Sequence, residues 1–148
     1  MELNDLIGDD NIDLNFKAFD KDDALKKLST LLCKGRTEII DEKEVYKILK
    51  EREELGSTGI GNEVAIPHGK AEMEIEIIAA IAISHEGVEF NALDEKPVKI
   101  FFVLLASKNA PSLHLKILAK ISRLLMDETI REKLLKATSI EEIRKILK

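Results

Sequence analysis

Two apolar runs constrain the fold of this chain more than any other feature of its sequence. Residues 75–83 and 98–106 are almost wholly apolar and rich in β-branched side chains. Such runs are typical of strands that are buried on both faces of a sheet, and these need a layer of helices on each side. The sequence therefore predicts an α/β fold: a single domain with a mixed β-sheet and helices packed on both faces.

Amphipathic segments supply the expected helices. Asp41 with Glu44, and Ser139 with Glu142, have the spacing of a capping box. Apolar residues recur with helical spacing after five candidate start positions: Asp20, Asp41, Pro111, Asp127 and Ser139. Shorter strands are expected at residues 12–16, 64–66 and around 88–90.

Length and composition limit the class of protein. A chain of 148 residues fits one domain, which we expect to span residues 1–148. No apolar run is long enough to cross a bilayer, and the acidic start lacks the features of a signal peptide, so we expect a cytoplasmic protein. Acidic and basic residues are interspersed, with a net charge of −5, which argues against nucleic acid as the main partner. Cys33 is the single cysteine, and a small buried hydrophobe is its expected role.

The segment 56–69 contains the strongest functional signal. Three glycines, at positions 56, 59 and 61, permit a loop whose amide groups form an anion-binding concavity. Pro67 then ends a short strand, so His68 is expected at a strand end, and Gly69 leaves one side of its ring uncovered. No nucleotide-binding motif accompanies these residues, so a phosphoryl group would not come from a bound nucleotide. The alternative is a plain connecting loop with a structural histidine.

Arg52 and His114 are the other candidates for contact with an anion. Arg52 lies just before the glycine-rich segment and is either an anion clamp or a solvated cation near a helix end. His114 falls in the first turn of a helix, where it either helps to hold a phosphate or is an ordinary surface histidine. His85 is given no role. Three scattered histidines without a metal-binding motif predict no metal site, and no cofactor is expected.

Several stretches together resemble the fructose/mannitol-type enzyme IIA family of the sugar phosphotransferase system, which also includes nitrogen-regulatory IIA proteins. The resemblance covers essentially the whole chain. It lies in residues 52–62 (REELGSTGIGN), 65–69 (AIPHG), 87–98 (GVEFNALDEKPV) and 113–121 (LHLKILAKI).

This resemblance implies a set of roles. His68 would receive a phosphoryl group from the histidine-containing phosphocarrier protein and pass it to a cysteine of enzyme IIB. His114 and Arg52 would lie beside the phosphate, and Thr58 is a further candidate for stabilising it. Glu63 stands where the family often has glycine, so it would add negative charge near the site.

The resulting hypothesis is a phosphocarrier for fructose or a related sugar or polyol, linked to the membrane only through a separate enzyme IIC transporter. Because such a site must meet two partners in turn, we expect it to be shallow, with an apolar rim around His68. One alternative is a nitrogen-type regulatory protein with the same histidine. Another is a hydrolase in which His68 is a general base and Ser57 or Thr58 lies nearby.

Overall fold

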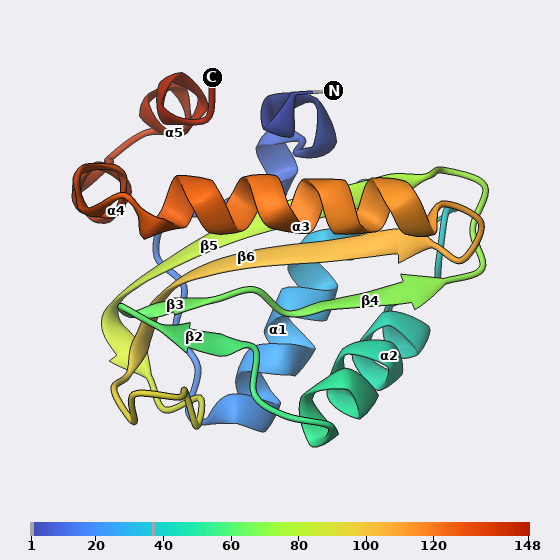
Figure 1. Cartoon of the computed structure of the whole chain (residues 1–148), viewed down its shortest axis with the longest axis horizontal. Helices are drawn as coiled ribbons and strands as arrows, with labels where there is room; N and C mark the ends of the chain where they lie inside the picture. The colour runs from blue at the N-terminus through green and yellow to red at the C-terminus, as the bar shows by residue number, and fades with distance from the viewer. Residues whose placement is uncertain (1, 37) are drawn as a thin grey trace.

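The computed structural model describes residues 2–36 and 38–148 of the chain (Figure 1). Two short 3-10 helices begin it, η1 (Leu3–Leu6) and η2 (Asp9–Asn11). The strands are β1 (Ile12–Asp13), β2 (Gly59–Gly61), β3 (Val64–Ala65), β4 (His68–Ala71), β5 (Ile77–Val88) and β6 (Val98–Ser107). The α-helices are α1 (Lys21–Cys33), α2 (Glu42–Glu54), α3 (Pro111–Met126), α4 (Glu128–Lys136) and α5 (Ile140–Ile146).

The sheet is mixed, as predicted, and its order is β1-β5-β6-β3-β2. The two long apolar runs form its centre, where β5 and β6 pair antiparallel. On the other side of β6, both β3 and β4 pair with it in parallel. Pro67 separates these two short strands because it has no amide hydrogen for a ladder. The interruption places His68 at the first position of β4, opposite Leu104.

Helices cover both faces of this sheet, which confirms the predicted α/β architecture (Figure 1). Side chains alternate along a strand, so neighbouring residues of β5 and β6 belong to different cores. Ile81 and Phe102 pack with α3, α4 and α5, whereas Ala80 and Phe101 pack with α1 and α2. The long strands are therefore apolar on both faces because each face carries its own core.

The helix starts follow the predicted positions, with one exception in detail. Asp20, Asp127 and Ser139 each accept a hydrogen bond from a backbone amide of the first turn. Asp41 occupies the cap position of α2 but its side chain makes no capping bond, so the capping box predicted there is wrong.

Two strand predictions need correction, and two further strands were not predicted. β5 continues to Val88, so the separate strand expected around residues 88–90 does not exist. The first strand covers only Ile12–Asp13 rather than 12–16. β2 and β4 were not predicted, because their glycine-containing stretches have no strand-like hydrophobic pattern.

Candidate functional site

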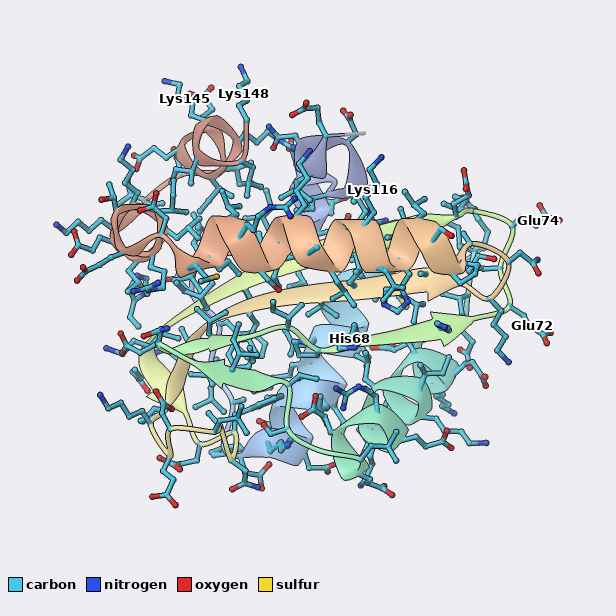
Figure 2. The ribbon with its side chains drawn as sticks, in the orientation of Figure 1. His68, Glu72, Glu74, Lys116, Lys145 and Lys148 are labelled. Atoms are coloured by element: carbon cyan, nitrogen blue, oxygen red, sulfur yellow. The ribbon has the colours of Figure 1, made fainter. Side chains whose placement is uncertain are left out.

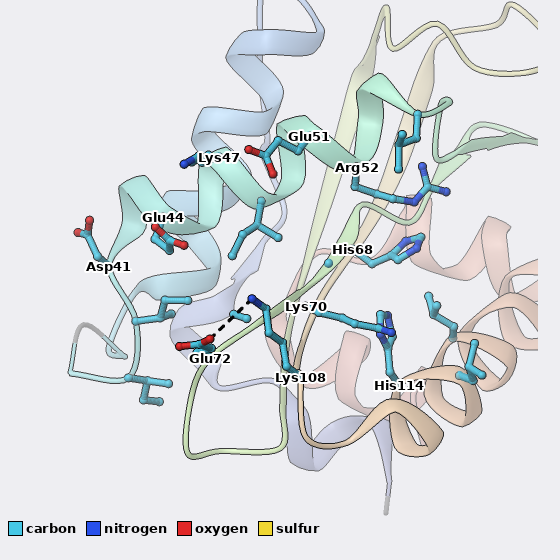
Figure 3. Close-up of a pocket in the computed structure, with 18 residues that line it drawn as sticks. Asp41, Glu44, Lys47, Glu51, Arg52, His68, Lys70, Glu72, Lys108 and His114 are labelled. Carbon is cyan, nitrogen blue, oxygen red and sulfur yellow. Dashed lines mark ion pairs between the residues drawn. The ribbon is translucent and has the colours of Figure 1, made fainter.

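A cavity of about 1280 Å³ opens between α2, β4 and the first turns of α3 (Figure 3). It brings together Arg52, His68 and His114, the three residues singled out by the sequence. Leu55 and Leu115 line it and are 85% and 70% exposed, so two apolar side chains of the predicted rim are accessible among charged neighbours. Figure 2 shows His68 between α3 and α2, in the broad face of the molecule.

The half-buried ring of His68 is held in one tautomer by the backbone. Its Nδ1 lies 2.8 Å from the carbonyl oxygen of Ile66. A carbonyl can only accept, so Nδ1 carries the proton and Nε2 has a free lone pair. Burial, aided by the positive charge of Arg52, lowers the pKa of His68 below its ordinary value. The ring is therefore neutral at pH 7, as a nucleophile must be.

His114 lies directly against His68. The two ring centroids are 5.5 Å apart, with an edge-on angle of 74°. The side chain is buried, yet neither ring nitrogen has a hydrogen-bond partner among the described residues. Burial, together with the charges of His68 and Lys70, lowers the pKa of His114 to about 4. A buried polar group without a partner is uncommon in proteins and suits a site that receives a polar group from outside.

Arg52 reaches the cavity from the last turn of α2, and Figure 3 shows its side chain beside His68. Its Nη1 donates a hydrogen bond of 2.9 Å to the carbonyl oxygen of Gly56. This bond ties the guanidinium to the start of the glycine-rich segment. A guanidinium has five N–H donors, so others remain for an anion in the cavity.

Thr58, by contrast, is not among the residues that line the cavity. It is buried, and both its amide and its hydroxyl donate hydrogen bonds to the carboxylate of Glu53. The structure therefore does not bring the Thr58 hydroxyl to the position expected from the sequence. Ser57 also lies outside the cavity lining, so neither of the two hydroxyls named in the hydrolase hypothesis lines the cavity with His68.

The structure does not support the anion-binding concavity predicted for the loop amides, because four of these amides already donate to acceptors within the chain. Those of Gly56, Thr58, Gly59 and Asn62 donate to the Glu53 carbonyl, the Glu53 carboxylate, Ser57 Oγ and Asp94 Oδ2, respectively.

Glu63 lies in the turn between β2 and β3, with a φ of 67°, and does not line the cavity. Its carboxylate is paired with Lys99 at 3.2 Å. The prediction that it adds negative charge near the site is therefore wrong.

Charged side chains that were not predicted as site residues line the rest of the cavity. They are Lys70, Glu72 and Lys108 together with Asp41, Glu44, Lys47 and Glu51 (Figure 3). Glu44, Ile48, Glu51 and Arg52 recur at helical spacing on α2, a signal that would have placed them on one face. In the part of the chain that the structure describes, no group of three or more His, Cys, Asp or Glu residues could hold a metal ion.

Comparisons with known proteins agree with this fold and site. The family model described as "Phosphoenolpyruvate-dependent sugar phosphotransferase system, EIIA 2" matches residues 5–148. A fructose-specific EIIABC component from Bacillus subtilis (strain 168) is 34% identical over 148 residues; these cover 99% of this chain and 23% of that protein. The chain therefore spans about a quarter of that relative's length.

Solved structures extend the likeness to the fold. The nitrogen regulatory protein IIA-Ntr from Neisseria meningitidis has a TM-score of 0.91 and 34% identity, over 99% of each chain. The complex of enzyme IIA and phosphorylated enzyme IIB for mannitol from Escherichia coli contains a chain that matches with a TM-score of 0.75 and 25% identity, over 96% of this chain and 98% of that one.

The fold and the family match together define a component of a phosphotransferase system. More particularly, the chain belongs to the EIIA type 2 family of the phosphoenolpyruvate-dependent sugar phosphotransferase system. No helix among the described residues is long and apolar enough to span a membrane.

Proposed function

We propose that this protein is a cytoplasmic phosphocarrier in which His68 accepts a phosphoryl group from the histidine-containing phosphocarrier protein and passes it to a cysteine of an enzyme IIB. The observation that carries the proposal is the hydrogen bond between His68 Nδ1 and the Ile66 carbonyl, which leaves the Nε2 lone pair free. His68 lines the cavity together with Arg52 and His114. Nε2 is therefore the nitrogen that becomes phosphorylated.

Acceptance is a simple displacement at phosphorus. The Nε2 lone pair of His68 forms the new N–P bond while the N–P bond of the donor histidine breaks, and its electron pair returns to the donor ring. The His68 ring becomes positively charged because Nδ1 keeps its proton. The Ile66 carbonyl stabilises that proton, since a hydrogen bond to a charged donor is stronger than one to a neutral donor.

Arg52 and His114 stabilise the transferring group. Arg52 offers charged N–H donors, and the neutral ring of His114 offers one N–H donor from a buried position. Little bond making is asked of the protein, so alignment and charge stabilisation account for most of the catalysis. In the onward step the partner's thiolate attacks phosphorus, an S–P bond forms, and the electron pair of the N–P bond returns to His68.

The eventual acceptor of the phosphoryl group is fructose or a related sugar or polyol, and the group reaches it through enzyme IIB and enzyme IIC. The fructose-specific relative from Bacillus subtilis supports the sugar, and the mannitol IIA–IIB complex from Escherichia coli supports the partner. The exposed Leu55 and Leu115 on the cavity rim suit transient contact with such partners.

A regulatory role of the nitrogen type is the second candidate, because the nitrogen regulatory protein from Neisseria meningitidis matches over 99% of both chains. The two roles share acceptance by His68 and differ in the next step. Genes for a sugar-specific IIB and IIC next to this one, with sugar-dependent dephosphorylation, would favour the carrier.

The test is intact-mass analysis after incubation with phosphoenolpyruvate, enzyme I and the histidine-containing phosphocarrier protein. We expect one acid-labile phosphoryl group on the wild type and on His85→Ala, and none on His68→Ala. His85 is the matched control because it is exposed on β5 and does not line the cavity. An unmodified wild type, with partners that phosphorylate another acceptor, would refute the proposal.

A further inference from the structure

A buried ion pair lies behind the site, outside the cavity. Glu53 follows Arg52 in the last turn of α2, and its side chain is only 4% exposed. Its Oε1 lies 2.8 Å from Nζ of Lys21, at the start of α1, and this ammonium also sits 4.8 Å from the centre of the Phe90 ring. Burying a carboxylate is costly unless its oxygens are paired, so the contacts of Glu53 need an explanation.

The carboxylate of Glu53 accepts two hydrogen bonds from Thr58. Oε1 accepts the Thr58 amide at 3.1 Å, and Oε2 accepts the Thr58 hydroxyl. Together with Lys21, these bonds occupy both oxygens. Two bonds to the same residue fix the orientation of the Thr58 peptide as well as its place.

Thr58 in turn leads to His68 through the backbone. Its carbonyl accepts the amide of Ile66 at 3.0 Å, and the carbonyl of Ile66 accepts Nδ1–H of His68 at 2.8 Å. A continuous series of polar contacts, one ion pair followed by hydrogen bonds, therefore runs from Lys21 through Glu53, Thr58 and Ile66 to the His68 ring. The last acceptor in this series is the group that selects the His68 tautomer.

Glu53 also anchors the residues around Arg52. Its own carbonyl accepts the amide of Gly56, and the carbonyl of Gly56 accepts Nη1 of Arg52. Glu53 thus connects to Arg52 and His68, two of the three cavity residues that the sequence singled out.

We propose that Glu53 is a positioning residue for phosphoryl transfer: through Thr58 and Ile66 it holds His68 as the Nδ1–H tautomer, with Nε2 free to attack phosphorus. The consequence for transfer rests on the proposed function, whereas the effect on the tautomer does not. Thr58 acts from behind the histidine, as the intermediate between the carboxylate and the Ile66 peptide.

Four variants separate positioning from simple stability. Glu53→Gln keeps the size but supplies one acceptor oxygen where two are used, and it puts an NH₂ group among donors. Thr58→Val removes the hydroxyl and keeps the shape, while Thr58→Ser restores the hydroxyl. Glu54→Gln is the matched control, because it removes a carboxylate from the next, exposed position of α2.

Two measurements apply to each folded variant. Nitrogen-15 NMR of the histidine ring at pH 8, where the ring is neutral, reports which His68 nitrogen carries the proton. The rate of phosphorylation by the histidine-containing phosphocarrier protein reports function. We expect Glu53→Gln and Thr58→Val to raise the share of the Nε2–H tautomer and to slow phosphorylation about tenfold, the usual order for a lost hydrogen bond. Thr58→Ser and Glu54→Gln should stay close to wild type in both.

The proposal is overturned if Glu53→Gln and Thr58→Val fold, keep the wild-type tautomer and react at the wild-type rate. A slower rate with an unchanged tautomer also overturns it, since that indicates a purely structural role. If Glu53→Gln does not fold, the comparison of Thr58→Val with Thr58→Ser decides. If the wild type is not phosphorylated, the proposed function is refuted. If the His68 tautomer nevertheless shifts in Glu53→Gln and Thr58→Val, the positioning role is supported.

Discussion

At the scale of single residues, His114 combines burial with the absence of a hydrogen-bond partner. Its side chain is 4% exposed, and both ring nitrogens are unpaired among the described residues. The pKa of about 4 means that the ring stays neutral in the folded protein where an unfolded chain would already be protonated. The folded state therefore binds fewer protons than the unfolded state between the ordinary pKa of 6.5 and pH 4.

This difference predicts how stability depends on pH. Above pH 6.5 the ring is neutral in both states, and below it the unfolded state gains protons first, so the free energy of unfolding falls with acidification. A difference of one bound proton changes the free energy of unfolding by about 1.4 kcal/mol per pH unit. The titration of His114 should therefore lower the free energy of unfolding by about 2 kcal/mol between pH 6.5 and pH 5. Urea denaturation of wild type and His114→Gln at several pH values measures this.

His114→Gln should lose less stability on acidification than the wild type. It should keep the part of the pH dependence that comes from His68, whose pKa is also lowered. Asp22 does not interfere because its pKa of about 2 lies below the window. Equal pH dependence in the two proteins would show that His114 titrates normally.

The positions of His68 and Arg52 in the fold were predictable from the sequence, because their chain neighbours decide them. Pro67 directly precedes His68, and Arg52 lies in the last turn of the helix before the glycine-rich segment. Thr58 and the loop amides could not be placed this way. Thr58 donates to the Glu53 carboxylate, and the amides of Gly59 and Asn62 donate to side chains of Ser57 and Asp94. These acceptors take their places only once the chain has folded, which residue types alone do not indicate.

At the scale of elements, the approach of α2 to β4 depends on Gly69. A Cβ at this position would lie 2.3 Å from Cγ2 of Ile48, one turn before Arg52 on α2. That distance is far below van der Waals contact. The glycine therefore lets the helix lie close enough for Arg52 and His68 to share one cavity.

We expect Gly69→Ala to push α2 away from β4. The overpacking should cost about 1–3 kcal/mol of stability. It should also slow phosphorylation of His68, because Arg52 moves with its helix. Adding Ile48→Ala should relieve the clash and recover part of the rate of His68 phosphorylation. A double-mutant cycle, measured by urea denaturation and by phosphorylation kinetics, detects this recovery. Additive losses in the double variant would contradict this account.

Elements were predictable from the sequence in proportion to the strength of their hydrophobic pattern. β5, β6 and the long helices bury long periodic faces, and their cores follow from the alternation. β2 and β4 are four residues or shorter and contain glycine. β4 forms because it pairs with β6, and β2 forms because it pairs with β3, which itself pairs with β6. These pairings depend on the position of β6 in the folded protein, which neither short segment encodes.

At the scale of the whole molecule, one sheet separates two cores that cannot exist without it. Leu134 of α4 belongs to the core under α3, whereas Tyr46 of α2 packs on the opposite core. Both cores are built on β5 and β6. Loss of either core exposes one face of the same strands, so we propose that residues 1–148 unfold as a single domain.

Tyr46 is the chain's one tyrosine and there is no tryptophan, so its fluorescence reports on the α1–α2 side alone. Leu134→Ala leaves a cavity on the other side and should cost about 2–5 kcal/mol. Because the strands transmit this loss, the urea midpoint measured by Tyr46 fluorescence should fall as far as the midpoint measured by far-UV circular dichroism. If the fluorescence midpoint stayed in place while the circular dichroism curve split into two steps, each core would be stable by itself. The sheet would then be a boundary between two units, and the cavity that holds His68, between α2 and α3, would lie across that boundary.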